Sequence, residues 1–100
     1  MKVYNISFQI DPVVEFQWLE WMKNNFIPKV IACQSFSDHK LYQIEVQADQ
    51  SPTYTLQLYC DNIELWQAYQ ELQANDHLKE VQHAWGEKCY YFCTEMQIVN

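Results

Sequence analysis

Residues 16–33, FQWLEWMKNNFIPKVIAC, hold two tryptophans three positions apart, two phenylalanines, a methionine and a proline. From residue 14 onward, a spacing of 3.6 residues places the large apolar side chains on one broad arc of a helix, with Glu15 the single charge inside it. The arc consists of Val14, Trp18, Leu19, Trp21, Met22 and Phe26. The opposite side carries Gln17, Glu20, Lys23 and Asn24. We therefore predict an amphipathic helix that faces a core and is stopped or kinked before Pro28.

Two tryptophans in one helix raise the question of a ligand box. Trp18 and Trp21 lie inside a continuous apolar arc, which is typical of a buried helix. We therefore interpret the stretch mainly as the interior of the protein. Phe16 and Ile27 fall off the arc, on the otherwise polar side, and are candidates for a contact surface.

Segments of alternating character surround this helix. Residues 3–10, VYNISFQI, alternate apolar and polar side chains, which is typical of a strand. Residues 36–48 and 53–60 alternate in the same way on either side of DQSP and predict a hairpin. A second helix after a capping box at residues 61–64, and a short third helix ending at Gly86, come before a last strand in KCYYFCTEMQIV.

The predicted order is strand, helix, strand, strand, helix, strand. This is the ferredoxin-like, or split βαβ, plan of the α+β class. We expect a single domain over residues 1–100, with the helices covering one face of a four-stranded antiparallel sheet.

Composition excludes several classes of function. The net charge is −7 and all six basic residues are lysines, so the chain lacks the cationic surface that nucleic acids and anionic membranes require. We expect neither as a partner. The single glycine, Gly86, excludes the glycine-rich loops that bind phosphates and dinucleotides.

The chain carries no sign of export. Its first residues alternate rather than forming a leader, and no apolar run approaches the roughly 18 residues of a membrane span. The four cysteines include no close pair, so we expect free thiols and a cytoplasmic protein. Neither C-x-x-C nor H-E-x-x-H occurs, and we expect no metal and no cofactor.

The sheet face turned away from the helices is predicted to be polar but mostly uncharged. We expect it to carry Asn5, Ser7, Gln9, Leu41, Gln43, Glu45, Thr55, Gln57, Tyr59, Tyr91, Cys93 and Glu95. Such groups tolerate burial when each finds a hydrogen bond. We therefore expect two copies to pair through these faces as a dimeric α+β barrel, with interface residues Gln9, Gln43, Gln57, Tyr59 and Tyr91. A monomer with an unusually glutamine-rich wet face is the alternative.

The opposite face suggests a pocket between helices and sheet. Tyr4, Tyr42, Tyr54 and Tyr90 are predicted to point toward the helices, where aliphatic residues would suffice for a dry core. The candidate ligand-binding residues are Tyr54, Tyr90, Trp66 and Trp18. His83 is the candidate catalytic residue, as an acid, a base or an axial ligand. Its alternative role is a surface histidine favoured by the negative end of a helix.

The segments MKVYNISFQID and WLEWMKNNFIPKVI, the hairpin, and LKEVQHAWGEKCYYF together resemble the small bacterial proteins grouped as domain of unknown function 4286. The resemblance spans nearly the whole chain. It is most specific at residues 18–22 and at Ile27-Pro28, and weaker at residues 83–88. It implies a bacterial protein that forms a dimeric α+β barrel, and it implies no established activity.

Barrels of this kind include haem-degrading and quinone-type monooxygenases. A haem-degrading site would nominate Asn5 and Trp66 together with His77 or His83. Asn5, however, alternates with the apolar residues of its strand and faces away from the helices. The absence of arginine also removes the best partner for haem propionates.

The sequence names no reaction, so the biochemical function is left open. The leading hypothesis is a homodimeric binding or interaction module whose helix–sheet pocket would accept a small apolar or aromatic molecule. The alternative is a cofactor-light enzyme of the monooxygenase or isomerase type that uses His83 and a tyrosine. A hydrated cleft reached by His83 would favour the enzyme. A filled core with tyrosine hydroxyls at its rim would favour the module.

Overall fold

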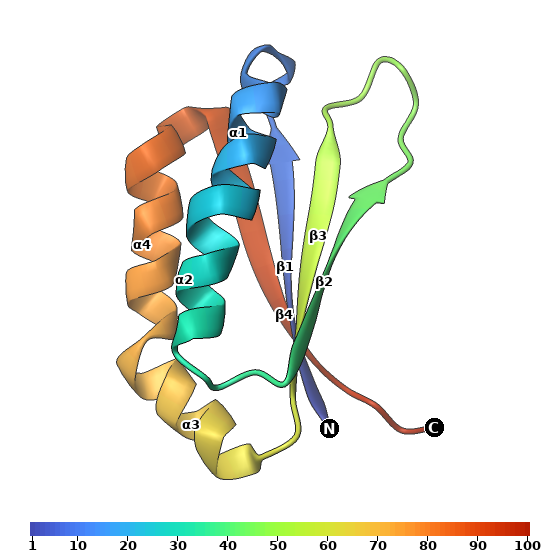
Figure 1. The fold of residues 1–100 in the computed structure, drawn as a ribbon. Helices are drawn as coiled ribbons and strands as arrows, with labels where there is room; N and C mark the ends of the chain where they lie inside the picture. Colours follow the sequence, from blue (N-terminus) through green and yellow to red (C-terminus); the bar gives the residue numbers. More distant parts are fainter.

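The computed structural model describes all residues, 1–100, and shows a four-stranded antiparallel sheet with the helices on one of its faces (Figure 1). The strands are β1 (Lys2–Ile10), β2 (Asp38–Ile44), β3 (Thr53–Cys60) and β4 (Cys89–Gln97). Their order across the sheet is β2-β3-β1-β4, so β1 lies inside the sheet and pairs with β3 and β4. The predicted ferredoxin-like α+β fold is confirmed.

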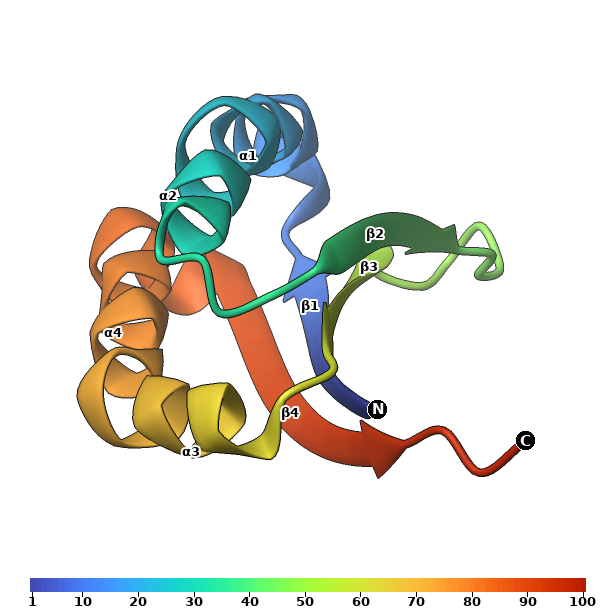
Figure 2. The same cartoon turned by 60° about the horizontal axis from the view of Figure 1, so that its bottom comes forward.

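The helices form two rods that lie side by side over the sheet (Figure 2). The first rod consists of η1 (Pro12–Val14), α1 (Glu15–Trp21), the π-helical turn η2 (Met22–Phe26) and α2 (Ile27–Ala32). The second consists of α3 (Ile63–Leu72), α4 (Ala74–Trp85) and the 3₁₀ turn η3 (Gly86–Lys88), with α3 set at an angle to α4 at Gln73 (Figures 1 and 2). Figure 2 shows that β2 extends beyond the area of the sheet that the helices cover. The face of the sheet opposite the helices is not covered by any other element.

Side-chain caps begin both rods. Asp11 accepts a hydrogen bond from the Val13 N–H at 3.0 Å, ahead of Pro12, as the sequence predicts. At the second rod, Asn62 is the cap: its Oδ1 accepts from the N–H groups of Glu64 and Leu65. The predicted box at residues 61–64 is therefore displaced by one position.

The π turn explains how one long helix keeps its apolar stripe on the sheet. Side chains at intervals of four, here Trp18, Met22 and Phe26, drift by about 40° per step in an α-helix. The Ile27 N–H donates to the carbonyl of Met22, five residues earlier, and this extra residue turns the following side chains back. Ile27 and Val30 are consequently buried, with exposed fractions of 8% and 0%. The prediction that Ile27 marks a contact surface is wrong because it assumed a regular 3.6-residue period. Phe16, in contrast, is 73% exposed.

The space between helices and sheet is a filled core. Trp18, Met22 and Phe26 from the first rod meet the inner residues of β1 and β3, and all three are at most 1% exposed. The second rod contributes Trp66, Tyr69 and Val81. Burying a side chain of this size stabilises the fold by about 1.5–3 kcal/mol. This packing holds both helical rods against the sheet.

The side chains of the edge strand β2 lie on the opposite faces of the sheet to those predicted. Residues directly opposite in an antiparallel pair point to the same face. Leu41 pairs with Leu56 and turns toward the helices, whereas Tyr42 pairs with Thr55 and lies on the open face. Gln43, proposed for the dimer interface, lies on the helix side of the sheet for the same reason. The strand carries apolar residues at both parities, so its alternation alone could not fix its orientation.

In the second edge strand, β4, the side chains also lie on the opposite faces of the sheet to those predicted. Tyr91 pairs with the buried Phe8 and packs against the core, so it is not an open-face residue. Tyr90 pairs with Gln9 on the open face and is 65% exposed, so it does not line a helix–sheet pocket. Cys93 and Glu95 likewise pair with inner residues of β1. Consecutive aromatic residues again left the parity ambiguous.

Gly86 ends α4 as predicted, but with φ 55° and ψ −129°, the mirror image of extended backbone. A Cβ atom there would meet nothing within 4 Å, so only backbone strain opposes a side chain.

We expect Gly86→Ala to lower the free energy of unfolding by about 1–3 kcal/mol. Gly86→Asn should cost nearly as much, because asparagine is tolerated in the left-handed helical region and not in this one. Urea denaturation measures both variants. An asparagine variant as stable as the wild type would show that the position is an ordinary left-handed cap.

Candidate functional site

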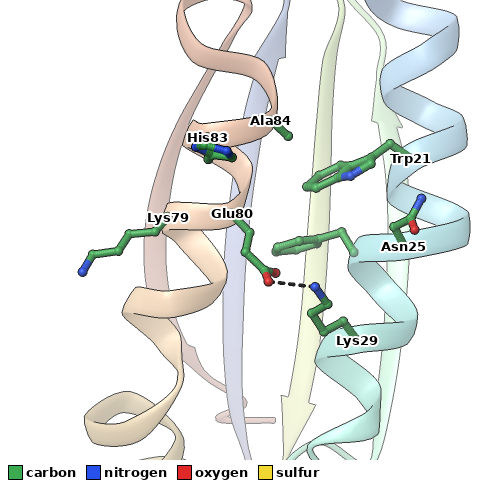
Figure 3. A pocket seen from close by; sticks show the side chains of 8 residues that line it. Trp21, Asn25, Lys29, Lys79, Glu80, His83 and Ala84 are labelled. Carbon is green, nitrogen blue, oxygen red and sulfur yellow. Dashed lines mark hydrogen bonds and ion pairs between the residues drawn. The ribbon is translucent and has the colours of Figure 1, made fainter.

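The largest cavity is a groove between the two helical rods, on the side away from the sheet. Its volume is about 470 Å³. It is lined by Trp21, Asn25, Phe26, Lys29, Lys79, Glu80, His83 and Ala84. The first four belong to the rod of α1, η2 and α2, and the others to α4 (Figure 3). This volume lies in the lower part of the range for small-molecule sites.

The π turn makes the aromatic wall of this groove. Residues five apart do not face each other on an α-helix. Across the wider turn, the rings of Trp21 and Phe26 stack with centroids 5.4 Å apart and an interplanar angle of 27°. Trp85 packs against Trp21 from α4 in a T-shaped arrangement, with ring centroids 5.8 Å apart. Turns of this kind are frequent at functional sites.

An ion pair crosses the groove at one end. Lys29 Nζ on α2 lies 2.7 Å from Glu80 Oε1 on α4 (Figure 3). Lys79 extends away from Trp21 in this view, so its aliphatic stem rather than its ammonium group lines the groove. Ala84 presents only a methyl group, which leaves space beside the aromatic wall.

His83 projects from the last turns of α4 beside this groove, at the level of Trp21 (Figure 3). It therefore reaches a cavity, but one between helices and not between helices and sheet. Of the eight lining residues, only His83 is predicted from the sequence as a site residue. The sequence analysis assigns Trp21 and Phe26 to the core, and Asn25, Lys29, Lys79 and Glu80 belong to polar helix faces that gave no sign of a site. The one sequence feature that could have revealed the groove is the spacing of the apolar residues of the first helix. Their stripe drifts around a regular helix, which indicates an irregular turn.

The residues predicted for a helix–sheet pocket lie inside the core. Trp18, Trp66 and Tyr54 are 0%, 3% and 6% exposed, and none of them lines the groove. The Tyr54 hydroxyl donates to Glu15 Oε2 at 2.7 Å, at the rim of the core. Burial, and then this hydrogen bond, raises the pKa of Tyr54 to about 12. Of the two criteria set from the sequence, the filled core with a rim hydroxyl is the one given for a module. The criterion for an enzyme is met in part, because His83 lines a cavity of about 470 Å³ that lies between the helices and not between helices and sheet.

A buried polar pair joins α3 to α4. The Tyr69 hydroxyl lies 2.8 Å from Nδ1 of His77, and His77 is 9% exposed. Burial raises the pKa of Tyr69, so its hydroxyl stays protonated, and the tautomer of His77 decides which of the two groups donates. Burial also lowers the pKa of His77, with smaller and opposing effects from Glu80 and Lys29.

Burial makes two of the four cysteines poor nucleophiles. All four are unbridged. Burial raises the pKa of Cys89 to about 11, and it also raises that of Cys93, whose sulfur accepts a hydrogen bond from Tyr4 at 3.3 Å. Neither side chain is therefore a thiolate nucleophile at neutral pH. Histidine, cysteine and acidic residues form no group of three with metal-binding geometry, and no helix is long and apolar enough to cross a membrane.

The open sheet face forms the second candidate surface. Its centre is a hydrogen-bonded network in which Thr55 Oγ1 donates to Asn5 Oδ1 at 2.6 Å and lies 3.4 Å from Ser7 Oγ. Beside it, the Tyr59 hydroxyl donates to Gln57 Oε1 at 2.7 Å. The strand register also places Gln9 on this face, so Gln9, Gln57 and Tyr59 lie where the sequence predicts them.

Apolar side chains flank the network on both edge strands. β2 contributes Tyr42 and Ile44, and β4 contributes Tyr90, Phe92 and Met96. These five are between 36% and 65% exposed. The inverted edge strands thus make the open face more apolar than the sequence analysis expects.

The whole chain matches one family. Residues 1–99 fit the model of the domain of unknown function DUF4286. The chain belongs to this family. The resemblance stated from the sequence is thereby confirmed, and this DUF4286 protein has no match among curated proteins.

Solved structures share the fold of this DUF4286 chain. A dimeric ferredoxin-like protein from an uncultured marine organism aligns with a TM-score of 0.70 and 11% identity, covering 100% of this chain and 96% of that one. An ethyl tert-butyl ether D (EthD) family protein from Bacillus halodurans aligns with a TM-score of 0.66 and 18% identity, covering 97% of this chain and 100% of that one. A candidate antibiotic biosynthesis monooxygenase from Deinococcus radiodurans aligns with a TM-score of 0.66 and 8% identity, covering 100% of this chain and 94% of that one. Identities this low establish the fold alone.

We expect the lowered pKa of His77 to make stability depend on pH. The unfolded chain protonates this histidine near pH 6.5, whereas the folded chain does so only at lower pH. As pH falls below about 6.5, the unfolded state binds more protons, and the free energy of unfolding decreases.

Urea denaturation between pH 7.5 and 5.5 tests this expectation. The variant His77→Gln should show a smaller loss of stability over that window than the wild type. His39→Gln, which removes an exposed histidine, should keep the wild-type dependence. Equal slopes for the wild type and His77→Gln would contradict the assignment.

Proposed function

We propose that this protein is a non-catalytic homodimeric module, assembled by pairing the open sheet faces of two copies. The observation that carries the proposal is the exposed apolar border of that face: Tyr90 and Phe92 are 65% and 60% exposed. Tyr42 and Ile44 form a second exposed apolar strip at the opposite edge of the sheet, and large apolar side chains exposed together on one face are typical of an interaction surface. A second copy would cover this border and exclude water from the central network.

The face is suited to self-association by a two-fold axis. In such an interface the same patch occurs on both copies, so it must be complementary to itself. Uncharged hydroxyl and amide groups meet this requirement, because each can donate to or accept from its own copy. The register places only one lysine and one aspartate on the face, Lys40 and Asp38, both on the edge strand β2. Like charges are therefore absent from its centre.

The fold relatives support this proposal. The marine protein is described as a dimeric ferredoxin-like protein, and so is a protein of unknown function from Thermobifida fusca that covers 98% of this chain. Sheets that pack face to face lie about 10 Å apart, which leaves room for interdigitating aromatic side chains. A stable pair buries about 800 Å² on each partner, which a four-stranded face can provide.

The enzyme alternative has weaker support in the structure. Some fold relatives carry monooxygenase titles, but here His83 and the rim hydroxyl of Tyr54 do not share a cavity. Asn5 belongs to the network of the open face, away from the helices, as the sequence analysis argues. We therefore favour association over catalysis, in the cytoplasmic setting expected from the sequence.

We expect Gln57→Lys and Phe92→Lys each to weaken dimerisation by at least about 100-fold. Each substitution places two lysines in a two-fold interface, where an uncompensated buried charge is costly. Sedimentation velocity over a concentration series gives the dissociation constants.

Phe16→Lys is the matched control. Phe16 is 73% exposed but lies on α1, so its replacement should leave the dimer unchanged. A wild-type monomer would overturn the proposal. Dimers that persist in both face variants, or that dissociate in the control, would move the interface away from the open sheet face.

A further inference from the structure

The chain as a whole is acidic, but more lysines than carboxylates line the groove between the rods. The protein carries 13 acidic and six basic residues, whereas two lysines and one carboxylate line the groove. The ammonium group of Lys79 extends away from Trp21 (Figure 3), which leaves Lys29 as the cation that a ligand beside the aromatic wall would meet. That carboxylate, Glu80, is already paired with Lys29. A ligand drawn here is therefore more favourably an anion than a cation.

The aromatic side chains of the groove favour a ligand with an aromatic ring. Trp21 offers an indole face whose position is fixed by Phe26 on one side and by Trp85 at its edge. Ala84 and His83 lie across the groove from it (Figure 3). The gap between a fixed indole and a small side chain admits a planar ring, and stacking on tryptophan favours such a ring.

We propose that this groove binds a small planar aromatic carboxylate, with its ring against Trp21 and its carboxylate on Lys29. A volume of about 470 Å³ accommodates one or two fused rings. Lys29 and Glu80 are 56% and 39% exposed, so their ion pair exchanges readily with a bound anion. The Asn25 amide, in the π turn, is a further hydrogen-bond donor at the same wall.

The site is independent of the proposed dimer. The groove is made entirely by the helical rods, whereas the open face lies on the other side of the sheet. Loss of ligand binding would therefore not affect dimerisation, and loss of dimerisation would not affect the ligand. The two proposals can fail separately.

The test is a titration of uniformly ¹⁵N-labelled protein followed by two-dimensional NMR. The chain has four tryptophans, and tryptophan-to-phenylalanine variants assign their indole N–H signals. Trp21 and its neighbour Trp85 report on the groove, whereas Trp18 and Trp66 report on the core. The probes are 2-naphthoate, the neutral 2-naphthamide and the cationic 2-(aminomethyl)naphthalene, which share one ring system. We expect saturable shifts of the Trp21 signal with 2-naphthoate, and weaker binding of the other two.

Paired variants separate recognition of the anion from a structural role of the ion pair. Lys29→Gln should weaken binding of 2-naphthoate about two- to fivefold, as expected for an exposed charge pair. Glu80→Gln should strengthen it, because the competing carboxylate is removed. If the ion pair merely holds the helices together, both variants weaken binding, and the proposal fails.

Two further variants complete the experiment. Ala84→Leu fills the space beside the aromatic wall and should abolish saturable binding while the other indole signals stay in place. Lys23→Gln removes an exposed lysine of the same rod that does not line the groove and should have no effect. Equal affinity for the carboxylate and the amide, tighter binding of the cation, or no shift at Trp21 would overturn the proposal.

Discussion

The π turn at Met22–Phe26 is the constraint on which the rest of the helical layer depends. A long helix over a sheet must keep its apolar stripe in contact, yet apolar residues spaced by four drift around a regular helix. One additional residue corrects the drift and buries Ile27 and Val30. The same turn brings Trp21 and Phe26 into a stack that faces the second rod. The packing of the core and the shape of the groove thus have a common local cause.

The sequence predicts the order of the elements well because long alternating and helical periods are local signals. β1 is unambiguous, with its four inner residues buried as the pattern requires. The edge strands are different. In β4, Tyr90, Tyr91 and Phe92 follow one another, and in β2, Leu41 and Tyr42 are adjacent, so both parities are apolar. Only pairing with β1 and β3 decides which side chains face the helices, and that is a non-local property.

The same limit applies to the candidate site. Tryptophan and tyrosine at apolar positions suggested an interior pocket, but their rings pack against one another and fill that space, as Tyr4 does against Trp66 at 5.1 Å. The groove instead lies between polar helix faces, where Lys29 and Glu80 are separated by 51 positions in the sequence. Their proximity follows from the packing of two rods. No spacing in the sequence encodes it.

The position of β2 has a consequence for how the chain folds. This strand extends past the helical rods, and Leu41 is its single partly buried residue. Few apolar contacts hold it, so its free energy of local opening is small and its amide hydrogens exchange with solvent faster than those of β1. Covering the open face would slow that exchange. Under the proposed pairing of open faces, the order of this edge strand would depend on protein concentration as well as on its own sequence, since folding of the edge and association of the chains would be one equilibrium.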